Sequence, residues 1–116
     1  MNKDELKKRT KLFAHRCVKL AVSLPKTILG QHISKQLIRC STSVAANYRA
    51  ACLAQSKASF VSKISIVLEE ADESLFWLEF IIDEHLIIES KIEQLLKESN
   101  ELTAIFFSVR KTCRMK

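Results

Sequence analysis

Apolar residues recur along most of the chain at alternating spacings of four and three, which is the spacing of one face of an α-helix. The first such series runs Leu6, Thr10, Phe13, Cys17, Leu20 and Leu24. Pro25 ends it, because proline cannot continue a helix. Three more series follow, so the pattern predicts four helices, over residues 3–24, 32–53, 57–83 and 90–113.

The fold class follows from how few turn-forming residues the chain has. Its 116 residues include one glycine and one proline, whereas sheets need clusters of such residues for their tight turns. The connections between the predicted helices are short, so neighbouring helices should run antiparallel. We therefore predict one all-α domain over residues 1–116, an antiparallel up-down-up-down four-helix bundle.

One segment has more apolar surface than a lone bundle can cover. The run LFWLEFII, residues 75–82, is apolar on nearly every face of its helix. An exposed apolar patch of this size is unusual on a monomer, and aromatic side chains commonly anchor interfaces. We therefore predict a homo-oligomer whose interface contains Phe76, Trp77, Phe80 and Phe107.

The second predicted helix contains the polar stretch QLIRCSTSVAANYRAA, residues 36–51, in which Asn47 occupies a position of the apolar series. Such a stretch suits an active site, a binding surface or the packing of the bundle itself. Antiparallel pairing with the third helix places Arg39 beside the acidic run at residues 69–73, so we expect an ion pair with Glu70 or its neighbour. We expect Asn47 to hydrogen-bond across the helices and to fix their register.

The sequence gives no support for catalysis. A carboxylate-bridged metal bundle needs Glu three residues before His, and none of the three histidines has it. The four cysteines form no CxxC pair, and we expect buried free thiols in a reducing cytoplasm. A single glycine excludes a glycine-rich phosphate loop. We therefore expect no enzymatic activity, no cofactor and no metal. The chain shows neither a signal peptide nor an apolar run long enough for a membrane, so we expect a cytoplasmic protein.

Basic residues are concentrated at the two ends of a chain whose net charge is +6. Residues 1–50 carry a net +9, residues 51–100 a net −6 and residues 101–116 a net +3. In an antiparallel bundle the start of the first helix lies near the end of the fourth, which should bring the basic clusters together. We expect such a surface to bind phosphates, although a lysine-rich face is also a common solvated surface. The candidate residues are Lys7, Lys8, Arg9, Lys11, Arg16, Lys19, Arg110, Lys111, Arg114 and Lys116.

Three runs together carry a family resemblance: the stretch at residues 36–51, the helix start AQSKASFVSK and the run EEADESLFWLE. They resemble the bacterial family of 23S rRNA intervening-sequence proteins. The resemblance implies a four-helix bundle that assembles as a homopentamer, and it brings no catalytic residues. It extends distantly to the accessory variability determinant of diversity-generating retroelements, a basic pentamer that works with nucleic acid.

These observations favour a non-enzymatic, oligomeric bundle that contacts RNA or DNA through its basic surface. The alternative is a protein-interaction scaffold whose basic face meets an acidic partner.

Overall fold

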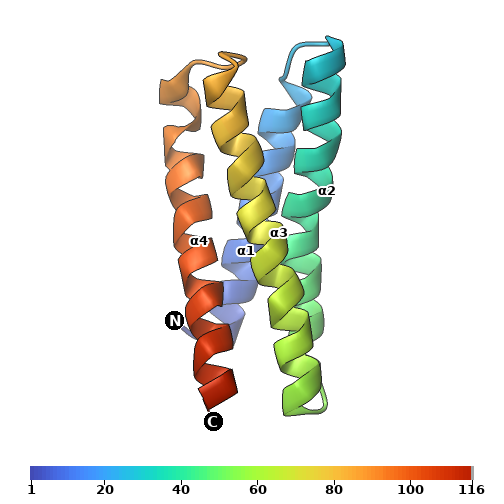
Figure 1. Ribbon diagram of the computed structural model, residues 1–116, viewed down its shortest axis with the longest axis vertical. Helices are drawn as coiled ribbons and strands as arrows, with labels where there is room; N and C mark the ends of the chain where they lie inside the picture. The colour runs from blue at the N-terminus through green and yellow to red at the C-terminus, as the bar shows by residue number, and fades with distance from the viewer. Residues whose placement is uncertain (116) are drawn as a thin grey trace.

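The computed structural model describes residues 1–115, and these form four helices that run alternately up and down (Figure 1). The helices are α1 (Lys3–Val22), α2 (Ile28–Ala51), α3 (Lys57–Asp83) and α4 (Glu89–Met115). Together they form a rod of 46 × 21 × 21 Å. The predicted all-α four-helix bundle is confirmed, and the described residues contain no strand.

Side-chain caps explain where the helices begin. Asn2 precedes α1 and accepts a 2.8 Å hydrogen bond from the Glu5 amide. Ser56 caps α3 in the same way by accepting a 3.0 Å hydrogen bond from the Ser59 amide, and the predicted start of this helix at residue 57 is correct. The predicted loop over residues 25–31 is too long, because Thr27 caps α2 by accepting a 3.0 Å hydrogen bond from the Gly30 amide.

Gly30 belongs to the first turn of α2 and allows a close approach of the backbone at the α1–α2 connection. A Cβ atom at this position would lie 2.0 Å from the carbonyl oxygen of Pro25. The only glycine of the chain is therefore needed for its lack of a side chain, and it does not break the helix.

The core follows the predicted apolar series with one important difference in α2. Asn47 is half-buried, and the core position is filled by the next residue, Tyr48, which is 5% exposed. The ring of Tyr48 packs on Phe106 of α4, with 5.4 Å between the ring centroids. The difference arises because 3.6 residues per turn make a strict 3–4 alternation drift along a 24-residue helix.

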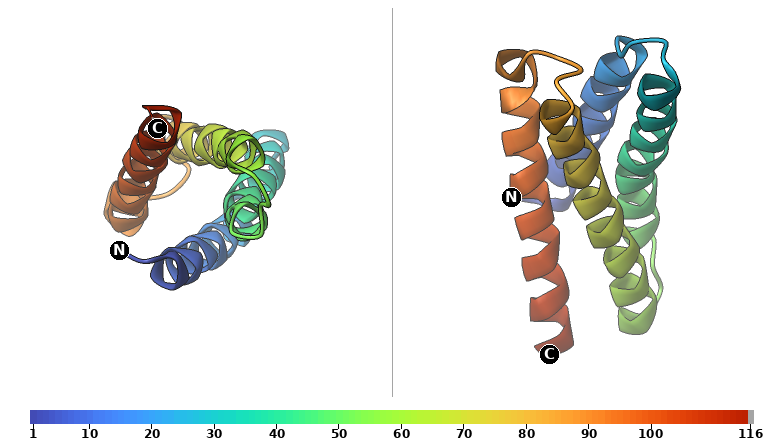
Figure 2. Two further views of the ribbon diagram at one scale, coloured as in Figure 1. Left: turned by 90° about the horizontal axis from the view of Figure 1, so that it is seen from below. Right: turned by 45° about the horizontal axis from the view of Figure 1, so that its top comes forward.

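The four sides of the bundle are not equally packed. Helices adjacent in sequence pack along much of their length, whereas α1 and α4 contact each other sparsely. In the end-on view of Figure 2 the helices follow one another around the axis, with α1 and α4 as the first and last. The α1–α2 pair and the α3–α4 pair therefore form opposite sides of the molecule.

Candidate nucleic-acid interface

The two sides of the bundle carry opposite charge. Helices α1 and α2 contain ten Lys and Arg residues and two acidic ones, a net +8. Helices α3 and α4 contain seven basic and ten acidic residues, a net −3. Because the two pairs form opposite sides, the positive potential is concentrated on the α1–α2 side.

A groove of about 760 Å³ runs between α1 and α2, and we call it the basic groove. Its lining consists of Lys7, Lys8, Lys11, Ala14, His15, Val18, Thr42, Ala45, Ala46 and Arg49. The cationic side chains come from one end of each helix, and the lining contains no acidic residue. Alanine and valine supply most of the remaining wall, so the groove offers both positive charge and apolar surface.

Exposed lysines continue from this groove to the α1–α2 connection, and we call them the lysine row. The row consists of Lys8, Lys11, Lys19, Lys26 and Lys35, all of which are exposed. None of the five is in an ion pair within residues 1–115. Sequence reasoning from the first helix missed Lys26, Lys35 and Arg49. The absence of acidic residues from 28–51 is a signal that could have identified the two in α2.

Arg9 was predicted to contact nucleic acid, but in the structure it forms an ion pair within the bundle. Its guanidinium donates hydrogen bonds of 2.8 and 2.7 Å to the two carboxylate oxygens of Glu98 in α4, and a weaker one to Glu101. The hydrogen bond with Glu98 raises the pKa of Arg9 despite partial burial. Arg9 is thus a paired structural residue. Arg16 is half-buried, and Lys7 lies 3.9 Å from Asp4.

The C-terminal basic cluster does not join the cluster of α1 into one patch. Since Arg9 faces Glu98, Arg110 lies twelve residues further along α4, a distance of about 18 Å at the rise of an α-helix. Figure 1 shows the last turns of α4 extending beyond the start of α1. Lys111 and Arg114 are exposed on those turns. Lys116, also a candidate, lies outside the described residues.

Arg39 lies beside the acidic run of α3, as the antiparallel pairing predicts. Its guanidinium is 2.9 Å from Glu70 and also hydrogen-bonds to Glu73. Glu73 in turn accepts a 3.2 Å hydrogen bond from the indole of Trp77. Partial burial would raise the pKa of Glu73, but the hydrogen bonds from Arg39 and Trp77 outweigh it and hold that pKa below its ordinary value.

Asn47 makes its hydrogen bonds within its own helix. Its amide nitrogen donates to the carbonyl oxygen of Ser43 at 3.0 Å and to the Ser43 hydroxyl at 2.8 Å. The amide nitrogen of Asn47 therefore does not donate the hydrogen bond across the helices that we expected from the sequence. A half-buried Asn on a helix readily finds the carbonyl one turn earlier, because that acceptor is already in place.

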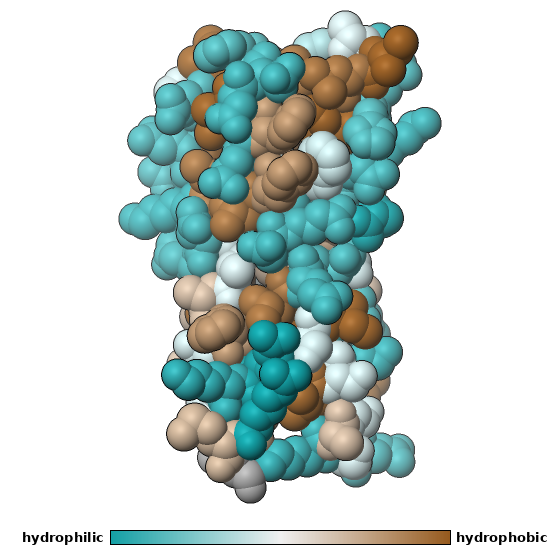
Figure 3. Space-filling model, viewed as in Figure 1, coloured by the Kyte–Doolittle hydropathy of each residue, from teal (hydrophilic) through white to brown (hydrophobic). Residues whose placement is uncertain are grey.

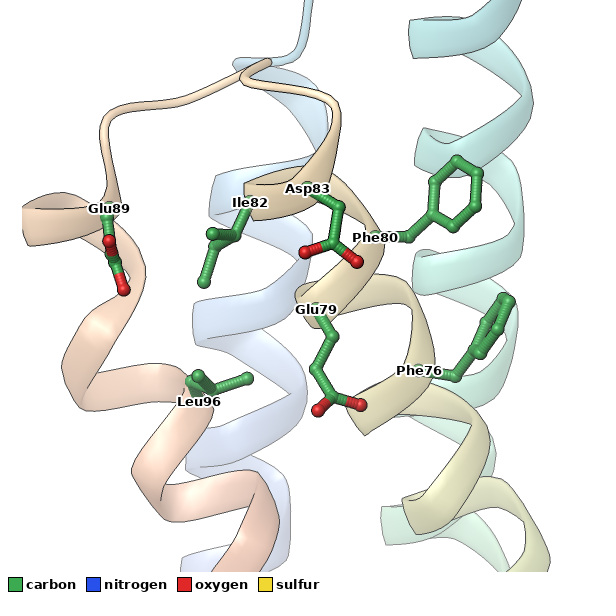
Figure 4. A pocket seen from close by; sticks show the side chains of 7 residues that line it. All are labelled: Phe76, Glu79, Phe80, Ile82, Asp83, Glu89 and Leu96. Atoms are coloured by element: carbon green, nitrogen blue, oxygen red, sulfur yellow. The ribbon is translucent and has the colours of Figure 1, made fainter.

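The four aromatic residues predicted for an interface lie on two surfaces. Phe76, Trp77 and Phe80 pack against one another on α3, with ring centroids 5.0–5.9 Å apart, and Figure 3 shows apolar side chains gathered over this part of α3. Figure 4 shows Phe76 and Phe80 directed away from α4, while Glu79 and Asp83 border a 390 Å³ cavity. Phe107 instead lies between α3 and α4 and is 53% exposed.

The thiols are free, and two of them are fully buried. Burial raises the pKa of Cys40 to about 11 and the pKa of Cys17 further still. Cys52 and Cys113 are partly exposed. Across residues 1–115 no three His, Cys, Asp or Glu side chains are grouped as metal ligands. None of the helices in that part of the chain is long and apolar enough to cross a membrane.

Comparison with known proteins agrees with the four-helix fold. The model of the family described as 23S rRNA-intervening sequence protein matches residues 2–108. A crystal structure from Bacteroides thetaiotaomicron, of a protein with unknown function from the S23 ribosomal protein family, superposes with a TM-score of 0.81. It shares 36% sequence identity, over 90% of this chain and 97% of the other. No curated protein matches the chain.

Proposed function

The chain belongs to the family of 23S rRNA-intervening sequence proteins, and from this premise we propose that it is a cytoplasmic, non-enzymatic homo-oligomer that binds RNA or another nucleic acid. The family resemblance favours a pentamer. The more distant resemblance to the accessory variability determinant likewise favours a basic oligomer that works with nucleic acid. In this proposal the contact is made by the α1–α2 side of the bundle.

One observation carries the proposal: the lysine row on α1 and α2 is exposed and free of ion pairs within residues 1–115. Lysines in this state attract phosphates and release condensed counterions when they bind them. Lys8 and Lys19 are eleven residues apart, which is three helical turns, so they project on the same side about 16 Å apart. The row can therefore contact several phosphates of one nucleic-acid strand.

The proposed binding reads phosphates rather than bases. Lysine contacts to phosphate oxygens position a protein on nucleic acid but carry no sequence information. The aromatic rings of α3, which could stack on bases, lie next to the carboxylates of Glu73, Glu79 and Asp83. We therefore expect affinity to depend strongly on salt and weakly on sequence.

The proposal is tested by fluorescence anisotropy with a labelled structured rRNA fragment at several salt concentrations. We expect sub-micromolar binding at low salt, with a steep decrease in affinity as salt rises. The variant Lys19→Glu/Lys35→Glu should lower the affinity at least tenfold and reduce the salt dependence by about two phosphate contacts.

The matched control is Lys57→Glu/Lys97→Glu, which makes the same change in net charge at exposed positions of α3 and α4. It should weaken binding much less. Absence of binding at low salt, or equal losses in both variants, would contradict the proposal.

A second candidate function is that of a protein-interaction scaffold, and the apolar part of the basic groove favours it. Ala14, Val18, Ala45 and Ala46 offer surface to a protein rather than to phosphates. A stoichiometric acidic protein that co-purifies would favour this function. Co-purifying nucleic acid, seen as excess absorbance at the nucleotide band, would favour the first function.

A further inference from the structure

Three rings on the last turns of α3 form a group that stays partly open to solvent, and we call it the aromatic cluster. It consists of Phe76, Trp77 and Phe80. Phe76 is 50% exposed, and the other two are half-buried. His32 of α2 meets Trp77 edge-on, with 5.6 Å between the ring centroids, and Figure 4 shows Phe76 and Phe80 directed away from α4. The cluster therefore lies on the α2–α3 side of the bundle.

Unpaired carboxylates surround the aromatic cluster. Residues 64–90 contain eight Asp and Glu residues and no Lys or Arg. Four of the eight are exposed, lie within one helical turn of a ring and form no ion pair in the described part of the chain: Asp72, Glu79, Asp83 and Glu84. On α2, Lys35 is exposed, whereas the charge of Arg39 is already compensated by Glu70 and Glu73. Negative charge thus dominates the surroundings of the rings.

This combination of rings and carboxylates selects among possible occupants of the surface. A guanidinium group stacks on an aromatic face and donates hydrogen bonds to a carboxylate, so an arginine side chain is satisfied by both. A polyanion is repelled by the same carboxylates. An uncharged apolar partner would bury them without a counter-charge, which is costly. Charge complementarity therefore favours a cationic partner.

The length of the surface suits a short extended peptide. Asp72 and Asp83 are eleven residues apart, which is three helical turns, so they project on the same side of α3 about 16 Å apart. Phe76 and Phe80 lie between them in the sequence. An extended chain advances about 3.3 Å per residue, so about five or six residues cover this distance.

We propose that the aromatic cluster docks an extended, arginine-rich segment of another protein. One guanidinium stacks on Phe76, the most exposed of the three rings, and further cations pair with Asp83 and Glu84 at the end of α3. The inference goes beyond nucleic-acid binding and does not depend on it, because none of these rings or carboxylates belongs to the lysine row.

Fluorescence anisotropy with a labelled peptide of about six residues, alternating arginine and glycine, tests the inference at low salt. We expect saturable binding below about 1 mM, and affinity about threefold or more above that of the matched lysine–glycine peptide, because guanidinium stacks better on rings. The unlabelled arginine peptide should also change the fluorescence of Trp77, the only tryptophan. Absence of binding, or binding that leaves Trp77 unaffected, would overturn the inference.

Charge reversal at the end of α3 tests the carboxylates. Asp83→Lys/Glu84→Lys should weaken binding of the arginine peptide about tenfold. Both positions are exposed, and cations are compatible with a helix C-terminus, so the fold should be kept. The matched control is Asp4→Lys/Glu93→Lys, which makes the same change in net charge at exposed positions of α1 and α4. It should weaken binding less than about twofold, because distant charges are screened. Equal losses in the two variants would contradict the inference.

Removal of a ring tests the stacking separately from the charge. Phe76→Ala should weaken binding of the arginine peptide and remove its advantage over the lysine peptide. Phe107→Ala is the matched control, because Phe107 is 53% exposed but lies between α3 and α4; it should preserve that advantage. Circular dichroism of both variants should equal that of the unaltered chain. An advantage for arginine that survives Phe76→Ala would count against the cluster as its docking site.

Light scattering separates this inference from the alternative that the sequence predicts for the same rings, a contact between copies. Asp83→Lys/Glu84→Lys should keep the molecular mass and the RNA affinity of the unaltered chain while losing the peptide. A loss of mass in this variant would assign the rings to a second copy and overturn the inference. RNA binding that persists when no peptide binds would leave the proposed function intact and refute the inference alone.

Discussion

Arg9 of α1 donates two hydrogen bonds to the carboxylate of Glu98 in α4, at 2.8 and 2.7 Å, across the most sparsely packed side of the bundle. Both side chains are largely shielded from water, with 23% and 18% of their surface exposed. A bidentate pair in such surroundings is stronger than a pair at the open surface. It therefore contributes to holding α1 against α4 where few apolar contacts do so.

We predict that Arg9→Met lowers the free energy of unfolding by about 1–3 kcal/mol, because it leaves the shielded Glu98 carboxylate without its partner. Urea denaturation at a fixed protein concentration measures the change. Lys11→Met, at an exposed position two residues away, should change the stability by less than about 0.5 kcal/mol. Equal effects of the two substitutions would show that the ion pair does not stabilise the α1–α4 side.

Ser99 of α4 is fully buried, and its hydroxyl has no hydrogen-bond partner within residues 1–115. A buried hydroxyl without a partner is destabilising, so Ser99→Ala should raise the free energy of unfolding by about 0.5–1 kcal/mol. Ser74 is the matched control, because it is equally buried but donates a 2.8 Å hydrogen bond to the Glu70 carbonyl. Ser74→Ala should lower the stability by about 1 kcal/mol in the same urea titration. The idea fails if Ser99→Ala proves the more destabilising of the two.

The buried thiols predict a loss of stability at alkaline pH. Burial raises the pKa of Cys40 from 9.0 to about 11, so the unfolded chain releases this proton at a lower pH than the folded chain does. The stabilisation is complete below pH 9.0 and decreases as the pH rises towards about 11. Cys40→Ala should therefore show a weaker decrease of the thermal midpoint over this range than the unaltered chain.

The partly exposed Cys113 supplies the control for this experiment. Cys113→Ala is the matched substitution at a partly exposed thiol, and Cys40→Ala should show the smaller alkaline decrease of the midpoint of the two. Identical pH profiles for the Cys40 and Cys113 variants would count against the buried-thiol explanation.

The lowered pKa of Glu73 predicts a second change, at acid pH. Its folded pKa lies below the ordinary value of 4.5, so the stabilisation is present above that value and is lost as the pH falls through the folded pKa. Trp77, the only tryptophan, reports the event directly through its hydrogen bond to Glu73. We expect its fluorescence to change as this carboxylate is protonated.

Glu73→Gln should abolish that acid change in Trp77 fluorescence while keeping an acceptor for the indole. The control is Glu79→Gln, which removes an exposed carboxylate from the same helix and should preserve the change. An acid transition that survives Glu73→Gln would assign it to another group.

Sequence periodicity predicts the helices and most of the core because both depend on local spacing. It fails at Asn47 and Tyr48. The strict spacing predicts Asn47 in the core, but the helix has drifted by one residue at this point, so Tyr48 is buried and Asn47 is half-buried. The ion pair of Arg39 was predictable from antiparallel pairing, since its partners lie on the adjacent helix.

The pairing of Arg9 was not predictable in this way, because Glu98 lies 89 residues away and the relative height of α1 and α4 depends on three connections. That height also determines how far the C-terminal cations lie from the lysines of α1. Arg49 of α2 lies near Lys7 and Lys8 of α1 only in the folded bundle, so no single segment of the sequence predicts the basic groove.

The unequal charge of the two helix pairs gives each molecule a permanent electric dipole across its short axis. At 0.1 M salt the field of such a dipole extends about 10 Å into solution before screening removes it. A polyanion within that distance exerts a torque that turns the α1–α2 side towards it before any contact forms. Encounters that begin in the wrong orientation are thereby corrected during diffusion, and this correction disappears at high ionic strength.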